Sequence, residues 1–166
     1  LFRRQGIRSV SMDDIAQHLG VSKKTIYKWY ENKDALVADC LEVLFPPQSR
    51  RDVEEWSRVF TATDQRAVVT DILANYMSPS FAQWRTFRLE SIVAARHSPD
   101  IAAQLAAYTF AARRALMAAA VKAPPGATIS PDTGLSARAS VLGLSILEIV
   151  DPTICQLDWR WIPIGR

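Results

Sequence analysis

The chain has 166 residues, of which 49% are hydrophobic and 22% charged, with a formal net charge of +3. This is an ordinary soluble, globular composition, and so small a charge does not by itself indicate nucleic-acid binding. No apolar run approaches the roughly 20 residues of a membrane span, and the charged start Leu1-Phe2-Arg3-Arg4 does not resemble a secretory leader. The two distant cysteines, Cys40 and Cys155, predict reduced thiols in a cytoplasmic protein.

The first predicted element is the end of a helix over residues 1–5, which stops at Gly6. One helical turn is too short to hold itself, so we expect this helix to begin before Leu1, outside this numbering. Near the helix end lie Arg3, Arg4 and Arg8, which either touch a DNA backbone or are simply solvated charges.

Residues 11–22 predict a short helix followed by a tight turn. Ser11 can cap the helix through its hydroxyl, and Gly20 can end it in a left-handed conformation. Between them, four apolar residues have the spacing of one helix face: Met12, Ile15, Ala16 and Leu19. Val21 is expected to plug the turn, and Ser22 to cap the next helix.

The second short helix predicts a buried side formed by Ile26 and Tyr30, and an unusual outward side. The residues left pointing outward are Lys23, Lys24, Thr25, Tyr27, Lys28 and Trp29. Lysines supply positive charge, while the hydroxyl and indole groups supply hydrogen-bond donors, which together suit a phosphate backbone. Two short helices joined by a tight turn, with such a face, predict a helix-turn-helix DNA-binding unit.

A third helix is predicted to start after Asn32, which can cap it. Lys33 at its first position lies beside free backbone N–H groups, an arrangement that favours anions. An apolar face follows: Leu36, Val37, Cys40, Leu41 and Leu44. We expect Pro46-Pro47 to end this helix and to divide the chain into a DNA-binding domain over residues 1–45 and a second domain over residues 46–166.

The run from Gly6 to Leu36, with its segments SMDDIA, GVSKKTIY and NKDAL, resembles the amino-terminal domain of the TetR family of transcriptional repressors. The resemblance covers the first quarter of the chain. It implies an all-helical, homodimeric repressor that binds palindromic operator DNA and responds to a small-molecule effector. The second short helix would then enter the major groove.

The resemblance also assigns roles to individual residues. Thr25 and Tyr27 fall on positions that the family uses for DNA contact, and Lys33 falls on its phosphate-gripping lysine. Ser22 and Lys23 fall on the start of the recognition helix. The sequence departs from the family pattern at two positions: Trp29 replaces the more common Tyr or His, and Tyr30 replaces Phe.

The second domain is predicted to be helical throughout, which makes the whole protein all-α. Helical stripes run over residues 53–60, 68–76, 80–97, 100–121, 132–150 and 152–161. Ser98 and Pro99 mark the start of the long fourth segment, and residues 124–131 form a loop. In the segment 132–150 the small residues Ala139, Ser140 and Gly143 let another helix approach closely. That segment is either the homodimer interface or an internal core face.

Aromatic residues are frequent between residues 56 and 110, on helices expected to converge. Mostly apolar surroundings with a few polar groups are typical of ligand pockets, although aromatic residues at helical spacing are also typical of plain cores. Our predicted effector contacts are Trp84, Phe87 and Tyr108. Glu90 and Arg113 are either polar groups of such a pocket or partners in surface ion pairs.

The sequence contains no motif that indicates catalysis, a cofactor or a metal site. It lacks a phosphate-binding Gly-rich loop, H-E-x-x-H and G-x-S-x-G, and Cys40 has the spacing of a core residue. The favoured interpretation is therefore a TetR-like DNA-binding regulator. The alternative is a helical protein that binds a small molecule or a protein partner and whose helix-turn-helix no longer reads DNA.

Overall fold

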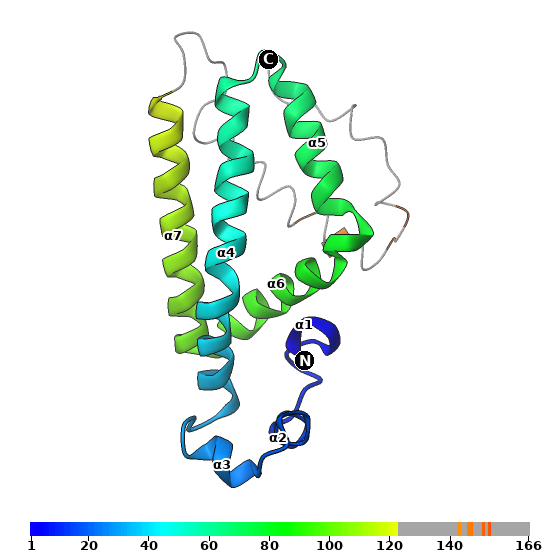
Figure 1. Cartoon of the computed structure of the whole chain (residues 1–166), viewed down its shortest axis with the longest axis vertical. Helices are drawn as coiled ribbons and strands as arrows, with labels where there is room; N and C mark the ends of the chain where they lie inside the picture. The colour runs from blue at the N-terminus through cyan, green and yellow to red at the C-terminus, as the bar shows by residue number, and fades with distance from the viewer. Residues whose placement is uncertain (123–142, 144–145, 148–150, 152, 154–166) are drawn as a thin grey trace.

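The computed structural model describes residues 1–122, 143, 146–147, 151 and 153. Within these residues the chain is helical and contains no strand, which confirms the prediction of an all-α protein. The molecule is elongated, with long helices along its length and the shortest helices toward one end (Figure 1). No helix in this part of the chain is long and apolar enough to cross a membrane.

The three amino-terminal helices are short: α1 (Phe2–Gln5), α2 (Met12–Leu19) and α3 (Lys23–Tyr27). The Ser11 hydroxyl accepts a hydrogen bond from the Asp14 N–H at 3.1 Å, and the Asp14 carboxylate accepts one from the Ser11 N–H at 2.8 Å. This reciprocal capping box starts α2. Gly20 ends α2 at φ 66°, and Ser22 caps α3 by accepting from the Thr25 N–H at 3.1 Å. The predicted caps and the Gly20 turn are confirmed.

A small apolar core holds these helices against the start of α4 (Lys33–Thr61). Its buried members from the amino-terminal segment are Phe2, Ile7, Val10, Met12, Ile15, Ala16 and Ile26. The prediction was wrong for Leu19, which is 60% exposed, and for Val21, which is also exposed rather than plugging the turn. Both flank Gly20, in the turn between α2 and α3, where their side chains are left to solvent.

Helix α4 corrects the prediction that Pro46-Pro47 ends the third helix. It runs unbroken from Lys33 to Thr61 with both prolines inside. The hydrogen bonds that these prolines cannot donate would reach the carbonyls of Glu42 and Val43. Both of those residues are exposed, so water can satisfy their carbonyl groups. The proposed boundary between residues 45 and 46 therefore lies within a continuous helix.

Four further elements complete the described part of the body: α5 (Gln65–Met77), the 3-10 turn η1 (Pro79–Phe81), α6 (Ala82–Ala95) and α7 (Pro99–Val121). The predicted segment 53–60 is part of α4, and the predicted segment 80–97 is divided between η1 and α6. Ser98 caps α7 with Pro99 at its first turn, as predicted. Helices α4 and α7 form the most extensive pair, and α1 packs against α6.

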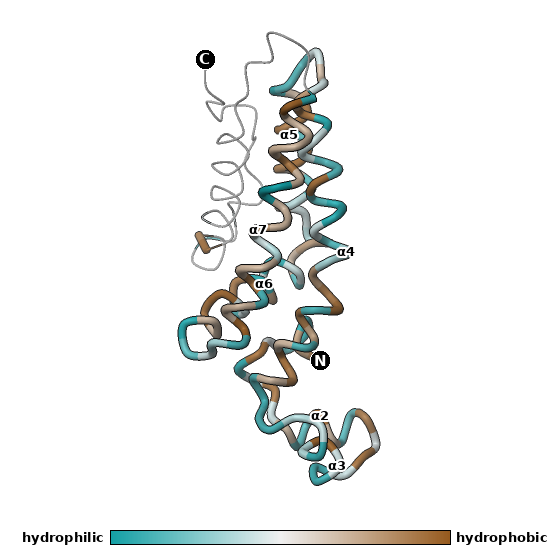
Figure 2. Tube along the Cα trace, turned by 90° about the vertical axis from the view of Figure 1, so that its left-hand side faces the viewer, coloured by the Kyte–Doolittle hydropathy of each residue, from teal (hydrophilic) through white to brown (hydrophobic). Residues whose placement is uncertain are grey.

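The view in Figure 2 places α2 and α3 at the end of the molecule opposite the tops of α4 and α5. A second apolar cluster fills the body between α4, α5 and α7: Trp56, Val59, Phe60, Val69, Ile72, Leu73, Tyr76 and Leu116. The helices predicted over residues 132–150 and 152–161 lie almost entirely outside the described residues.

Candidate nucleic-acid interface

The eight predicted DNA-contact residues gather at the tip formed by α3, the turn after it and the first residue of α4 (Figure 1). They are Ser22, Lys23, Lys24, Thr25, Tyr27, Lys28, Trp29 and Lys33. Seven are exposed and Lys33 is half-buried. Trp29 is 81% exposed, which is costly for an indole ring in water unless another surface covers it. The tip therefore combines cationic, hydroxyl and aromatic groups on one outward surface.

Asp13 belongs to this surface, although the sequence interpretation did not include it. The Lys23 ammonium lies 2.8 Å from the Asp13 carboxylate and joins α3 to α2. This hydrogen bond raises the pKa of Lys23 above its usual value. Both side chains are exposed, so the pair orients Lys23 more than it stabilises the fold. Lys24, Lys28 and Lys33 form no ion pair with any residue that the structure describes.

Hydrogen bonds orient the residues on either side of α3. Thr25 and Ser22 lie with their hydroxyl oxygens 2.8 Å apart on the first turn of α3. The Tyr30 hydroxyl is hydrogen-bonded to Asp39 of α4, and this bond, together with burial, raises the pKa of Tyr30. The departure from Phe at this position therefore adds a polar link between α4 and the turn before it.

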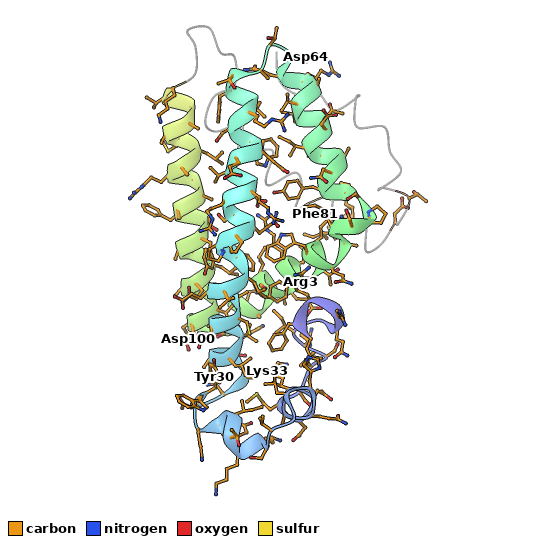
Figure 3. The ribbon with its side chains drawn as sticks, in the orientation of Figure 1. Arg3, Tyr30, Lys33, Asp64, Phe81 and Asp100 are labelled. Carbon is orange, nitrogen blue, oxygen red and sulfur yellow. The ribbon has the colours of Figure 1, made fainter. Side chains whose placement is uncertain are left out.

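Lys33 occupies the first position of α4, directly after the Asn32 cap (Figure 3). The Asn32 side chain accepts from the Ala35 N–H at 2.9 Å. Ser11 lowers the pKa of Asp14 through side-chain and backbone hydrogen bonds, and the charge of Lys33 lowers it further. Lys33 therefore lies near the start of α2 as well as at the start of α4.

Glu90 has a role that the sequence interpretation missed. Its carboxylate, on α6, accepts hydrogen bonds from the backbone N–H of Ile7 and, at 3.3 Å, of Arg8. Gly6 has φ 87°, and a Cβ there would overlap the Glu90 carboxylate. The turn between α1 and α2 is thereby held directly to the body. No local pattern could have predicted this, because the partners lie far apart in the sequence.

The three predicted effector contacts lie together at the junction of α4, α6 and α7. Trp84 and Phe87 are buried, and Tyr108 is half-buried. The ring of Phe45 on α4 touches all three, with centroid distances of 5.0 Å to Trp84, 6.0 Å to Phe87 and 5.3 Å to Tyr108. This aromatic cluster belongs to the core that also supports the DNA-binding helices. Trp84 also lines a cavity of about 350 Å³, and neither Phe87 nor Tyr108 belongs to the lining of that cavity.

The body also contains buried polar groups that the sequence did not reveal. Asp52 on α4 is buried and accepts from the Gln48 side chain at 2.7 Å. Tyr76 on α5 is hydrogen-bonded to Asp52, and burial together with the Asp52 charge strongly raises the pKa of Tyr76. Arg85 is buried and donates to the carbonyl of Ser78 at 2.8 Å. These bonds satisfy groups that would otherwise destabilise the core.

The part of the chain described here contains no cluster of three or more His, Cys, Asp or Glu side chains that could hold a metal ion. Cys40 is a free thiol whose pKa is raised by burial. Its position beside the apolar core agrees with the structural interpretation of its spacing.

Comparison with known proteins agrees with this architecture. Residues 1–40 match the family described as bacterial regulatory proteins, tetR family. Among curated proteins, none matches the sequence. Among solved structures, the chain is similar to GusR of Salmonella enterica, with a TM-score of 0.66 and 16% sequence identity over 98% of this chain and 82% of that chain. At this identity the likeness establishes the fold. Residues 1–40 thus match the tetR-family amino-terminal unit, and the chain shares the all-α fold of a solved structure over almost its whole length.

Proposed function

We propose that the protein is a dimeric repressor that binds palindromic operator DNA and releases it on binding a small molecule. The observation that carries this proposal is the tip around α3, where exposed lysines lie beside Thr25, Tyr27 and Trp29. Helix α3 would enter the major groove, and Lys33 would bind a phosphate at the start of α4.

Helix α4 suits the transmission of an effector signal. One continuous helix carries Lys33 at the DNA end and Phe45 in the aromatic cluster with Trp84, Phe87 and Tyr108. An effector that contacts this cluster and prefers one orientation of α4 would shift the population toward that orientation. The spacing of the two recognition helices in a dimer would change with it.

The dimer would place two such tips on successive turns of one DNA face. Gly143 supports this part of the proposal because a side chain there would meet nothing within 4 Å. Nearby, Ile146 and Leu147 are 54% and 52% exposed. Exposed apolar side chains beside a glycine are suited to close packing against a second helix.

The proposed function is tested by measuring how tightly the protein binds the DNA upstream of its gene. Fluorescence anisotropy at several salt concentrations gives the affinity. We expect a Kd of about 10⁻⁸ M or tighter and at least about a thousandfold preference over random DNA. Lys33→Ala should weaken binding to all sequences and reduce the salt slope by about one. The matched control is Lys122→Ala, which removes the same charge from the exposed end of α7.

Tyr27→Phe separates the contribution of the Tyr27 hydroxyl to DNA binding from the contribution of its aromatic ring. It removes only the hydroxyl of a side chain that is 46% exposed. We expect about a tenfold loss of operator affinity, with folding unchanged, as for one lost hydrogen bond to DNA. Equal and weak binding to operator and random DNA would contradict the repressor proposal. That outcome would favour a helical protein that binds a small molecule or a partner without reading DNA.

A further inference from the structure

A cavity of about 350 Å³ lies where the DNA-binding unit meets the body. Arg3 of α1 forms one side of it, and the middle of α4, with Gln48 and Arg51, forms another. Ser80 and Phe81 of η1 and Trp84 of α6 complete the lining, and Figure 3 shows Arg3 and Phe81 on the same side of α4. The volume falls at the small end of the range for ligand sites.

The cavity is positively charged. Both charged residues in its lining are arginines, and none of its lining residues is acidic. Neither the Arg3 nor the Arg51 side chain forms a hydrogen bond or an ion pair with any residue in the described ranges. The buried Asp52 carboxylate does not line the cavity, and it already accepts hydrogen bonds from Gln48 and Tyr76. Glu55, one turn beyond Arg51, is attracted to that arginine but also lies outside the lining.

Apart from Gln48 and Ser80, the remaining lining is apolar and includes two aromatic rings. Phe81 and Trp84 contribute aromatic rings, and Val43, Leu44 and Pro47 of α4 contribute aliphatic surface. The indole nitrogen of Trp84 is buried and has no hydrogen-bond partner among the residues that the structure describes. An oxygen acceptor on a ligand that reached this N–H would satisfy it.

From these features we infer that the cavity binds a small planar aromatic carboxylate. The guanidinium groups of Arg3 and Arg51 can each pair with a carboxylate through two parallel hydrogen bonds. The aromatic part of the ligand packs between Phe81 and Trp84 on one side and α4 on the other. Because Arg3 belongs to α1 and Arg51 to α4, the bound anion ties the DNA-binding unit to the body. The role of this ligand as an effector rests on the proposed function. Its binding to the cavity does not depend on that function.

Titration calorimetry on the free protein tests the inference, with 2-naphthoate and its uncharged analogue 2-naphthamide as probes. We expect the acid to bind at least about tenfold more tightly than the amide. Arg3→Gln and Arg51→Gln should each weaken binding of the acid about tenfold or more and leave binding of the amide unchanged. Arg4→Gln and Arg50→Gln are matched controls, because both residues are exposed neighbours that do not line the cavity.

Equal binding of acid and amide, or equal affinity in all four variants, would overturn the inference. Failure of the anion site is distinguishable from failure of the repressor proposal, because the calorimetry contains no DNA. Anisotropy with operator DNA and saturating 2-naphthoate then measures the coupling. Wild-type operator affinity should change at least about threefold, and Arg51→Gln should reduce the change at the same ligand concentration, because the variant binds the acid more weakly. Arg51 lies far along α4 from Lys33, so this variant leaves the proposed DNA contacts in place. If operator affinity does not change with 2-naphthoate, the effector role is refuted, whereas the anion-binding site itself stands.

Discussion

At the scale of single residues, the contact between Gly6 and Glu90 joins the DNA-binding unit to the body. Gly6 adopts φ 87°, a conformation that residues with a side chain rarely adopt, and the absence of a Cβ leaves room for the Glu90 carboxylate. That carboxylate in turn satisfies the N–H groups of Ile7 and Arg8. One glycine and one carboxylate thus define how α1 sits against α6.

Gly6→Ala should destabilise the protein more than Gly20→Ala. Gly20 also has positive φ, but nothing lies within 4 Å of a Cβ there, so its cost is backbone strain of about 1–2 kcal/mol. Gly6 has φ 87° and ψ 156°, a backbone region almost exclusive to glycine, and overlap with Glu90 adds to that strain, so we expect a loss of about 2–4 kcal/mol. Urea denaturation of the two variants measures the difference. Equal losses would show that the Glu90 carboxylate moves aside at no cost.

Glu90→Ala should release the turn after α1. Without the carboxylate, the N–H groups of Ile7 and Arg8 lose their acceptor. We expect amide hydrogen exchange at Ile7 to accelerate about tenfold or more, because local opening becomes easier. Glu54→Ala, which removes an exposed carboxylate from α4, is the control. Unchanged exchange at Ile7 would mean that packing of α1 alone holds the turn.

At the scale of elements, α4 determines the geometry of the molecule. It begins at the DNA tip, passes the aromatic cluster and the cavity, and ends in the second apolar cluster. Two prolines inside a helix oppose this continuity, since each removes a hydrogen bond and crowds the preceding turn. Packing of α4 against α7, its most extensive partner, outweighs that local cost.

Pro46→Ala should therefore stabilise the protein. The substitution restores a backbone N–H within α4 and removes a steric conflict of up to about 3 kcal/mol, partly offset by about 0.4–1 kcal/mol of greater unfolded-chain entropy. We expect a net gain of about 1–2 kcal/mol, measured by thermal and urea unfolding. Pro99→Ala is the control, and we expect it to lower the stability, because Pro99 occupies the first turn of α7, where proline is favourable. A loss of stability in Pro46→Ala would show that the native α4 depends on the proline conformation.

At the scale of the whole molecule, the DNA tip and the body lie at opposite ends of an elongated structure (Figure 2). A single tip would contact one half-site, so the proposed repression depends on a dimer. In the proposed dimer both tips would bind one DNA molecule, and the affinity of the pair would exceed that of one tip through effective concentration.

Gly143→Arg should separate the proposed dimer. A long charged side chain at this position would prevent close approach of a second helix, and we expect the dimer dissociation constant to rise about tenfold or more. Operator affinity should fall in parallel, while the helical content of each chain is retained. Sedimentation velocity measures the assembly, with Thr63→Arg in the exposed loop after α4 as the control. A dimer that resists Gly143→Arg would place the interface elsewhere.

Local patterns were sufficient to predict the helix-turn-helix. The caps at Ser11, Ser22 and Asn32, and the turn at Gly20, depend on groups no more than four positions apart. Such interactions are encoded in short stretches of sequence, and the outward residues of α3 follow from its helical period. The all-α class and the start of α7 at Ser98 followed from the same kind of signal.

Other features depended on contacts between distant residues. The passage of α4 through Pro46-Pro47, the exposure of Leu19, and the bonds from Glu90 to the turn after α1 were not predicted. The convergence of Phe45 with Trp84 and Tyr108 likewise needed the packed structure. Local propensity is worth about 1 kcal/mol per residue, whereas burial of a large apolar side chain contributes about 1.5–3 kcal/mol. Packing can therefore override local signals, and only the tertiary structure decides where it does.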